Sequence, residues 1–212
     1  EPAIVFLERY LGVGFNGPVR MSRFGQLEAE GTEYMSFADG EYLMGTNKTA
    51  DNNFFNGAID EWSIITTALS ASEVAALATG PICEPTCSDL PVAPATWLNM
   101  DDGSGAVAAD SSGSGFDFDL VGGASFGEGT YGTGLSLDGT NGYATALAGG
   151  YPDLNTESFT ISIRARYDRD AFPTASDGED YVLVQTTNGD GGQGRSLIYV
   201  DSSCGGQAPP FL

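Results

Sequence analysis

The chain has no histidine, and lysine and arginine together supply only 8 of its 212 residues. Histidine is the commonest general base in enzymes. Its absence excludes the Ser-His-Asp and Cys-His catalytic arrangements and most zinc sites. The shortage of basic residues leaves a net charge of −21, so the surface repels phosphate backbones and anionic lipid. No transmembrane run is present either, so we expect neither a nucleic-acid partner nor membrane insertion.

Cysteine is also scarce, with three residues: Cys83, Cys87 and Cys204. Cys83 and Cys87 offer too few ligands for zinc and lack the two-residue spacer of a redox motif, so we expect a local disulfide between them. Cys204 is then unpaired and is expected to bond to another chain or to a segment outside this sequence. Asn47 begins the tripeptide Asn-Lys-Thr, a glycosylation acceptor sequence in a secreted protein. These features favour an extracellular, secreted protein.

Short runs rich in Val, Ile, Phe, Thr and Tyr alternate with turn residues, and glycine is abundant at 30 residues. This pattern predicts an all-β protein. The best strand is at residues 159–167, where Phe159, Ile161, Ile163 and Ala165 are expected to face inward and Thr160, Ser162, Arg164 and Arg166 outward. At residues 58–65 neither face is cleanly apolar, so we expect Asp60 or Glu61 to meet a polar partner.

One short helix is predicted at residues 71–79. Ser70 is placed to cap its first turn, with Glu73 three residues later to complete a capping box. Gly80 and Pro81 end it. Residues 81–95 hold four of the ten prolines and two of the cysteines, which predicts a semi-rigid linker.

Four segments resemble the laminin-G-like, concanavalin A-like jelly-roll family. WLNMDDGSGAVAADSSGSG (97–115), FGEGTYGTGLSLDGTNGYA (126–144) and LNTESFTISIRAR (154–166) resemble the opening strands of such a domain. FFNGAIDEWSIITTALSASEVAAL (54–77) resembles its closing strands and terminal helix. The resemblance implies an antiparallel β-sandwich of two sheets packed face to face.

The order of these segments is reversed, because the closing segment precedes the opening ones. We therefore expect residues 1–80 to be the C-terminal part of one sandwich, 81–95 a Pro/Cys linker, and 96–212 the N-terminal part of a second. Half a sandwich leaves unpaired edges and an uncovered apolar face. Three arrangements resolve this: a window from a longer tandem array, two halves that fold together within one chain, or a head-to-tail homopolymer in which each chain completes its neighbour.

The resemblance also implies a structural calcium ion near the first and last strands. The candidate ligands are Asp60, Asp101, Asp102, Asp110 and Asp138, since Ca²⁺ takes carboxylate and carbonyl oxygens from such turns. The alternative is that Asp and Gly are only turn formers here.

No catalytic residue stands out. Carboxylates two residues apart occur at 117/119 and 168/170, but in acid-rich turns at strand ends. We expect a non-enzymatic extracellular structural or adhesive protein, a subunit or fragment of a fibre or tandem surface array with strand complementation between units. The alternative is a calcium-dependent carbohydrate-binding, lectin-like module with glycans as partners.

Overall fold

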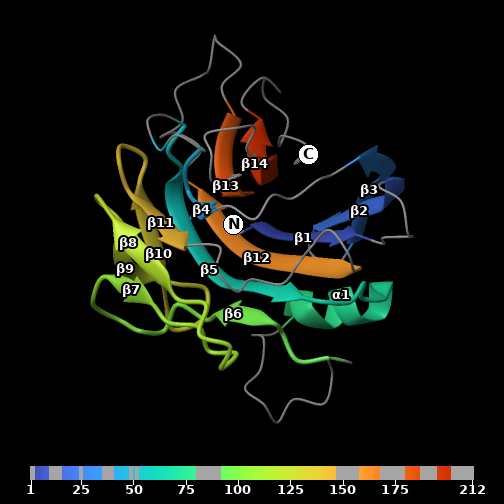
Figure 1. Cartoon of the computed structure of the whole chain (residues 1–212), viewed down its shortest axis with the longest axis horizontal. Coiled ribbons are helices and arrows are strands. Elements are labelled where there is room, and N and C mark those ends of the chain that lie inside the picture. Colours follow the sequence, from blue (N-terminus) through green and yellow to red (C-terminus); the bar gives the residue numbers. More distant parts are fainter. Residues whose placement is uncertain are drawn as a thin grey trace.

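The computed structural model describes residues 3–9, 16–23, 26–34, 41–47, 50, 53–79, 92–146, 158–167, 180–186 and 195–201. Its strands form two antiparallel sheets, and the described part of the chain contains one short helix (Figure 1). The predicted all-β sandwich is therefore confirmed. Cys83, Cys87 and Cys204 lie outside the described residues, as does most of the expected linker.

The larger sheet has β5 at its centre. Its order is β3 (Gln26–Tyr34), β2 (Asn16–Arg23), β1 (Ala3–Arg9), β12 (Phe159–Tyr167), β5 (Asn56–Ile65), β10 (Thr133–Asp138) and β9 (Ser125–Glu128). A further short strand, β6 (Thr96–Leu98), pairs with the second half of β5. Strand β5 is thus hydrogen-bonded on both sides along most of its length.

The smaller sheet has β4 near its centre. Its order is β14 (Arg195–Asp201), β13 (Asp180–Thr186), β4 (Tyr42–Met44), β11 (Tyr143–Ala146), β8 (Phe118–Val121) and β7 (Val107–Ala108). Strand β4 pairs with β13 on one side and β11 on the other. Central strands of both sheets therefore come from the first 65 residues.

The main core lies between the sheets and is organised around Trp62, which is fully buried. Its ring meets Phe118 edge-on, with centroids 5.3 Å apart, and Tyr42 at 6.4 Å. Such edge-to-face pairs stabilise by about 0.5–1.5 kcal/mol beyond their buried area. Because Trp62 comes from the larger sheet and Phe118 and Tyr42 from the smaller one, these contacts join the two layers.

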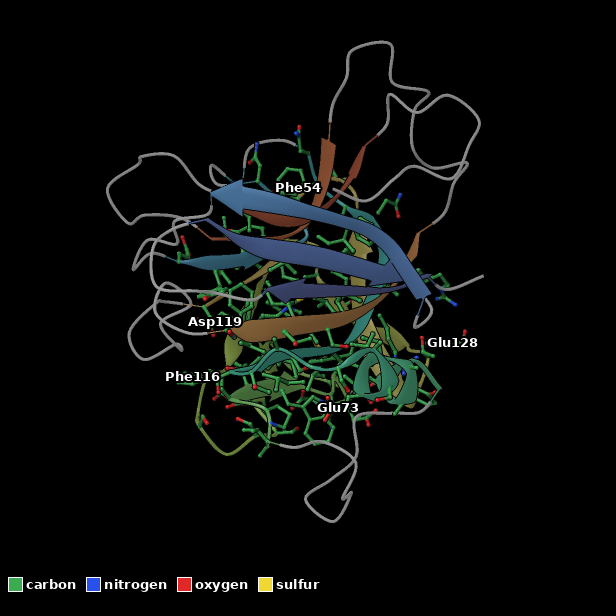
Figure 2. All side chains as sticks on the ribbon, turned by 90° about the vertical axis from the view of Figure 1, so that its right-hand side faces the viewer. Phe54, Glu73, Phe116, Asp119 and Glu128 are labelled. Carbon is green, nitrogen blue, oxygen red and sulfur yellow. The ribbon has the colours of Figure 1, made fainter. Side chains whose placement is uncertain are left out.

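Helix α1 (Ala71–Thr79) begins with the predicted capping box. The Ser70 amide donates to Oε2 of Glu73 at 2.6 Å, and the Glu73 amide donates to Oγ of Ser70 at 3.4 Å. The hydrogen bonds from Ser70 lower the pKa of Glu73, which is labelled in Figure 2. Figure 1 shows α1 beside the end of β5 and close to β6.

A second, smaller apolar cluster joins the helix to the larger sheet. It consists of Ile65, Leu69, Val74, Leu77 and Trp97. Ahead of the helix, Oγ1 of Thr160 accepts from the Leu69 amide at 3.1 Å and donates to the Thr67 carbonyl at 2.9 Å. The helix is too short to be stable alone, so these contacts hold it on the sheet.

Residues 3–79 (the N-terminal part) and residues 92–201 (the C-terminal part) share both sheets. Strand β5 pairs with β10 and β12, and β4 pairs with β11 and β13. Strands of the two parts therefore pair with one another in both sheets. The division into 1–80, 81–95 and 96–212, and the choice among the three arrangements, stay predictions.

A β-bulge breaks the alternation expected for β5. Ser63 pairs with Ser162 and Asp60 with Arg164, so two residues of β5 face one residue of β12. Glu61 occupies the bulge with φ of 51°. Strict alternation would place Ile59 and Trp62 on opposite faces of β5, but the bulge lets both enter the main core.

Candidate functional site

Buried and half-buried polar side chains gather on the outer face of the larger sheet, opposite the core. We call them the outer polar cluster: Asp60, Glu61, Trp97, Tyr131 and Arg164. The predicted polar partners of Asp60 and Glu61 are confirmed, and both carboxylates are almost fully buried, at 2 % and 3 % exposure.

Asp60 joins β5 to the loop at residues 129–133. Its Oδ2 accepts hydrogen bonds from the amides of Thr130 at 2.7 Å and Tyr131 at 3.0 Å. Its Oδ1 is buried and has no hydrogen-bond partner among the described residues. Burial raises the pKa of Asp60 despite the amides, and the charge of Asp101 acts in the same direction. A proton is thus held more readily here than on an exposed aspartate.

Gly129 lets this loop approach Asp60 closely. A Cβ atom at Gly129 would lie 2.5 Å from the Thr133 carbonyl oxygen and 2.9 Å from Oδ2 of Asp60. Real Cβ atoms do not come this close, so a side chain here would push the loop away from the sheet. Glycine is therefore needed for the contact.

Glu61 binds the first strand of the C-terminal part. Its Oε2 accepts a hydrogen bond from the indole Nε1 of Trp97 at 2.8 Å. The bulge turns the Glu61 side chain to the outer face, where the indole lies. The pair is separated by 36 residues in sequence, which explains why the sequence alone did not reveal Trp97 as its partner.

Arg164 lies under the end of helix α1. Its Nη2 donates to the Leu77 carbonyl at 2.7 Å, and its guanidinium carbon lies 4.7 Å from the centre of the Tyr131 ring. A cation at a helix C-terminus and over an aromatic face is stabilised by both. The sequence predicts an outward position for this side chain, yet only 3 % of it is exposed because the helix covers it.

A groove lies next to this cluster, formed by two adjacent hollows. One, of about 220 Å³, is lined by Ala58, Asp60, Glu128, Gly129, Thr130, Arg164 and Arg166. The other, of about 380 Å³, is lined by Asn56, Gly57, Ala58, Glu128, Ser136, Leu137 and Arg166. Figure 2 shows Glu128 on the side of the molecule away from Asp119 and Phe116. Sequence reasoning missed this groove, whose only local signal is the Arg164/Arg166 alternation.

The five calcium candidates are not gathered into one site. Asp60 and Asp101 approach the same loop, since Oδ1 of Asp101 accepts from the Thr133 amide at 2.8 Å. Asp102 instead accepts from the Ala109 amide at 3.2 Å. Among the described residues, no three acidic or cysteine side chains come together in a way that could hold an ion. The set as a whole does not fit one calcium ion, and calcium stays a prediction.

Asp110 organises the turn that follows β7. Its carboxylate accepts from the amides of Trp97, Ser112 and Phe116 at 2.9 to 3.1 Å, and from Oγ of Ser112 at 2.8 Å. Burial alone would raise its pKa, but these hydrogen bonds outweigh burial and lower the pKa of Asp110. This carboxylate already has a structural role in holding its turn.

Asp138 has a similar role in the turn between β10 and β11. Its Oδ1 accepts from the amides of Thr140, Asn141 and Gly142 at 2.8 to 3.0 Å. These bonds outweigh the partial burial and lower the pKa of Asp138. The turn-forming alternative thus accounts for Asp110 and Asp138.

Asn47 is half-buried at the end of the segment that follows β4, and its carbonyl accepts from the Ala50 amide at 3.0 Å. The next two residues of the sequon lie outside the described part of the chain. The described segments contain no helix with the length and apolarity needed to cross a membrane.

No family model matches this sequence, and neither a curated protein nor a solved structure shows significant similarity to it.

Proposed function

We infer that this chain is a non-enzymatic structural or adhesive β-sandwich protein of an extracellular setting, joined to its neighbours by strand complementation. The observation that carries this is the central position of β5. The same strand that completes this sandwich can complete the sandwich of the next unit, in a tandem array or a head-to-tail homopolymer.

The energetic argument rests on what β5 buries. Ile59, Trp62, Ile64 and Ile65 are fully buried, and each such side chain contributes about 1.5–3 kcal/mol relative to exposure. Their sum is comparable to the whole stability of a domain, about 5–15 kcal/mol. The C-terminal part therefore needs a β5, whichever chain supplies it.

The outer polar cluster fixes the register in which β5 pairs with the strands of the C-terminal part. Asp60 binds the 129–133 loop, Glu61 binds Trp97, and Arg164 binds the end of α1. Each contact joins the N-terminal part to the C-terminal part. A strand shifted by one residue would leave these buried groups without partners, at a cost of about 1–3 kcal/mol each.

The extracellular setting rests on the sequence: the Asn47 sequon, the Cys83/Cys87 pair and the absence of a nucleic-acid or membrane-surface charge pattern. In this proposal Cys204 bonds to another chain or unit, and the high negative charge keeps the assembled units soluble.

Cysteine cross-linking tests the proposal. Ala58 and Ser136 are register partners on β5 and β10, and both line the groove. In a chain with Cys83, Cys87 and Cys204 replaced by serine, we introduce Ala58→Cys and Ser136→Cys and oxidise. Complementation between units predicts a ladder of covalent multimers on non-reducing gels, growing with protein concentration.

The matched control places cysteines at Glu128 and Thr133, which are register partners on β9 and β10 of the same part. This pair should close within one chain under either arrangement. A monomer band for both pairs at every concentration would contradict complementation between units.

A calcium-dependent carbohydrate-binding module is the second candidate. It is favoured by Asp60 and Asp101, whose charges interact and whose carboxylates face the same loop, with Oδ1 of Asp60 lacking a hydrogen-bond partner. Calcium would then raise the melting temperature, and Asp101→Asn would abolish the increase. Identical melting in calcium and in chelator would exclude this candidate.

A further inference from the structure

The groove on the outer face of the larger sheet crosses four neighbouring strands, β12, β5, β10 and β9. Its two hollows share Ala58 of β5, Glu128 of β9 and Arg166 of β12. They therefore form one continuous depression that runs along the first half of β5. This feature is independent of how neighbouring units assemble.

Small residues form part of the groove lining. Gly57 and Ala58 of β5 lie beneath it, with Gly129 at one end. Gly129 cannot be larger without pushing against Thr133 and Asp60. The floor is also firm, since β5 is hydrogen-bonded to β12 and β10 on its two sides.

Two opposite charges line this floor without pairing. Arg166 and Glu128 are both exposed, and both line each hollow. Neither side chain has a hydrogen bond or an ion pair in the described part of the molecule. The groove thus offers a set of guanidinium donors and a pair of carboxylate acceptors to a ligand between them.

The charges and hydrogen-bonding groups of the groove lining limit which classes of ligand can bind. Phosphate and sulfate would meet Glu128, Asp60 and a net charge of −21, while a free cation would meet Arg164 and Arg166. An extended peptide would leave its amides unpaired, because the strands below already pair with one another. A neutral hydroxyl group both donates and accepts hydrogen bonds, so it can accept from Arg166 and donate to Glu128.

We propose that this groove binds a short neutral saccharide without calcium. Ring hydroxyls accept hydrogen bonds from the Arg166 guanidinium and donate to the Glu128 carboxylate, while the ring rests on Gly57 and Ala58. The hollows fit a small ligand, because the larger is near the lower end of the roughly 300–1,000 Å³ typical of drug-sized ligand sites. No aromatic side chain lines either hollow, so stacking is replaced by charge-assisted hydrogen bonds.

Binding is tested on the full chain in chelator-containing buffer by isothermal titration and saturation-transfer NMR. The probes are the neutral trisaccharides maltotriose, cellotriose, mannotriose and chitotriose, with trigalacturonate as a charged comparison. A solvated site without stacking predicts a Kd of about 1 mM for at least one neutral probe. Arg166→Ala and Glu128→Ala should each weaken binding by at least about tenfold, since each removes charge-assisted hydrogen bonds.

Asp119→Asn serves as the matched control, because Asp119 is exposed and lies away from Glu128 (Figure 2). It should leave binding unchanged, and unchanged melting temperatures in all three variants would show that folding is intact. The proposal is overturned if no neutral probe binds at 10 times the expected Kd of about 1 mM. It is also overturned if only trigalacturonate binds, or if neither groove substitution weakens binding.

Discussion

The carboxylate of Glu61 accepts a hydrogen bond from the indole of Trp97 at 2.8 Å, and both side chains are almost fully buried. Glu61 holds this position from a β-bulge with a left-handed backbone. The pair lies outside the main core, where it joins the closing segment of the sequence to its opening segment. A contact that depends on an irregular backbone is specific to one register.

Glu61→Leu should destabilise the fold by about 1–3 kcal/mol, because it leaves the Trp97 indole without its acceptor. Urea unfolding followed by tryptophan fluorescence measures the loss. Glu61→Gln is the control, since its amide oxygen can still accept and it should cost less. In Trp97→Phe, which has no donor, Glu61→Leu should cost less than in the natural chain; an equal cost would show that the pair is not coupled.

Asp60→Asn should change how stability depends on pH. Burial raises the folded-state pKa of Asp60 above its ordinary 3.8, so its contribution is full below that value and is lost as pH rises through the folded-state pKa. The natural chain should therefore lose stability relative to Asp60→Asn as pH rises from 3.8 through the folded-state pKa of Asp60. The asparagine oxygen still accepts from Thr130 and Tyr131. Urea midpoints across this range measure the difference, and a constant difference would contradict the prediction.

Asp110→Ala should have the opposite pH dependence. The hydrogen bonds of its turn lower the pKa of Asp110, so its stabilisation is present above 3.8 and is lost as pH falls through the folded-state value. At neutral pH the substitution should cost about 1–3 kcal/mol, since several turn amides lose their acceptor. Thermal unfolding at pH 7, and at successively lower pH values below 3.8, measures both effects. Asp119→Ala, at an exposed position, should change neither.

Gly129→Ala should destabilise the sandwich by about 1–3 kcal/mol, the usual cost of overpacking. The added Cβ would press on Thr133 and Asp60, and so pull the loop from the sheet. Gly127→Ala is the comparison, because its Cβ would meet only the Ser136 side chain at 3.2 Å. Equal melting temperatures for the two variants would show that the loop adapts freely.

Local patterns in the sequence predicted what depends on neighbouring residues. The Ser70/Glu73 capping box and the inward face of β12 follow from spacing alone, and both are confirmed. The turn role of Asp110 and Asp138 could also be anticipated, since aspartate readily accepts from backbone amides a few residues later.

Features that depend on distant residues could not be predicted this way. The bulge at Glu61 changes which residues of β5 face the core, and no local pattern marks it. Arg164 follows the alternation of its strand but is buried, because a helix from another part of the chain covers it. The groove arises only where β12, β5, β10 and β9 lie side by side.

The sequence position of β5 has a consequence for synthesis. Its partner β12 is synthesised nearly 100 residues after it, and the interval between β4 and its partner β13 is longer still. Contacts this far apart in sequence slow folding and prolong the time that apolar strand edges are exposed. The net charge of −21 then reduces aggregation during folding, because nascent chains that repel one another are less prone to pair through those strand edges.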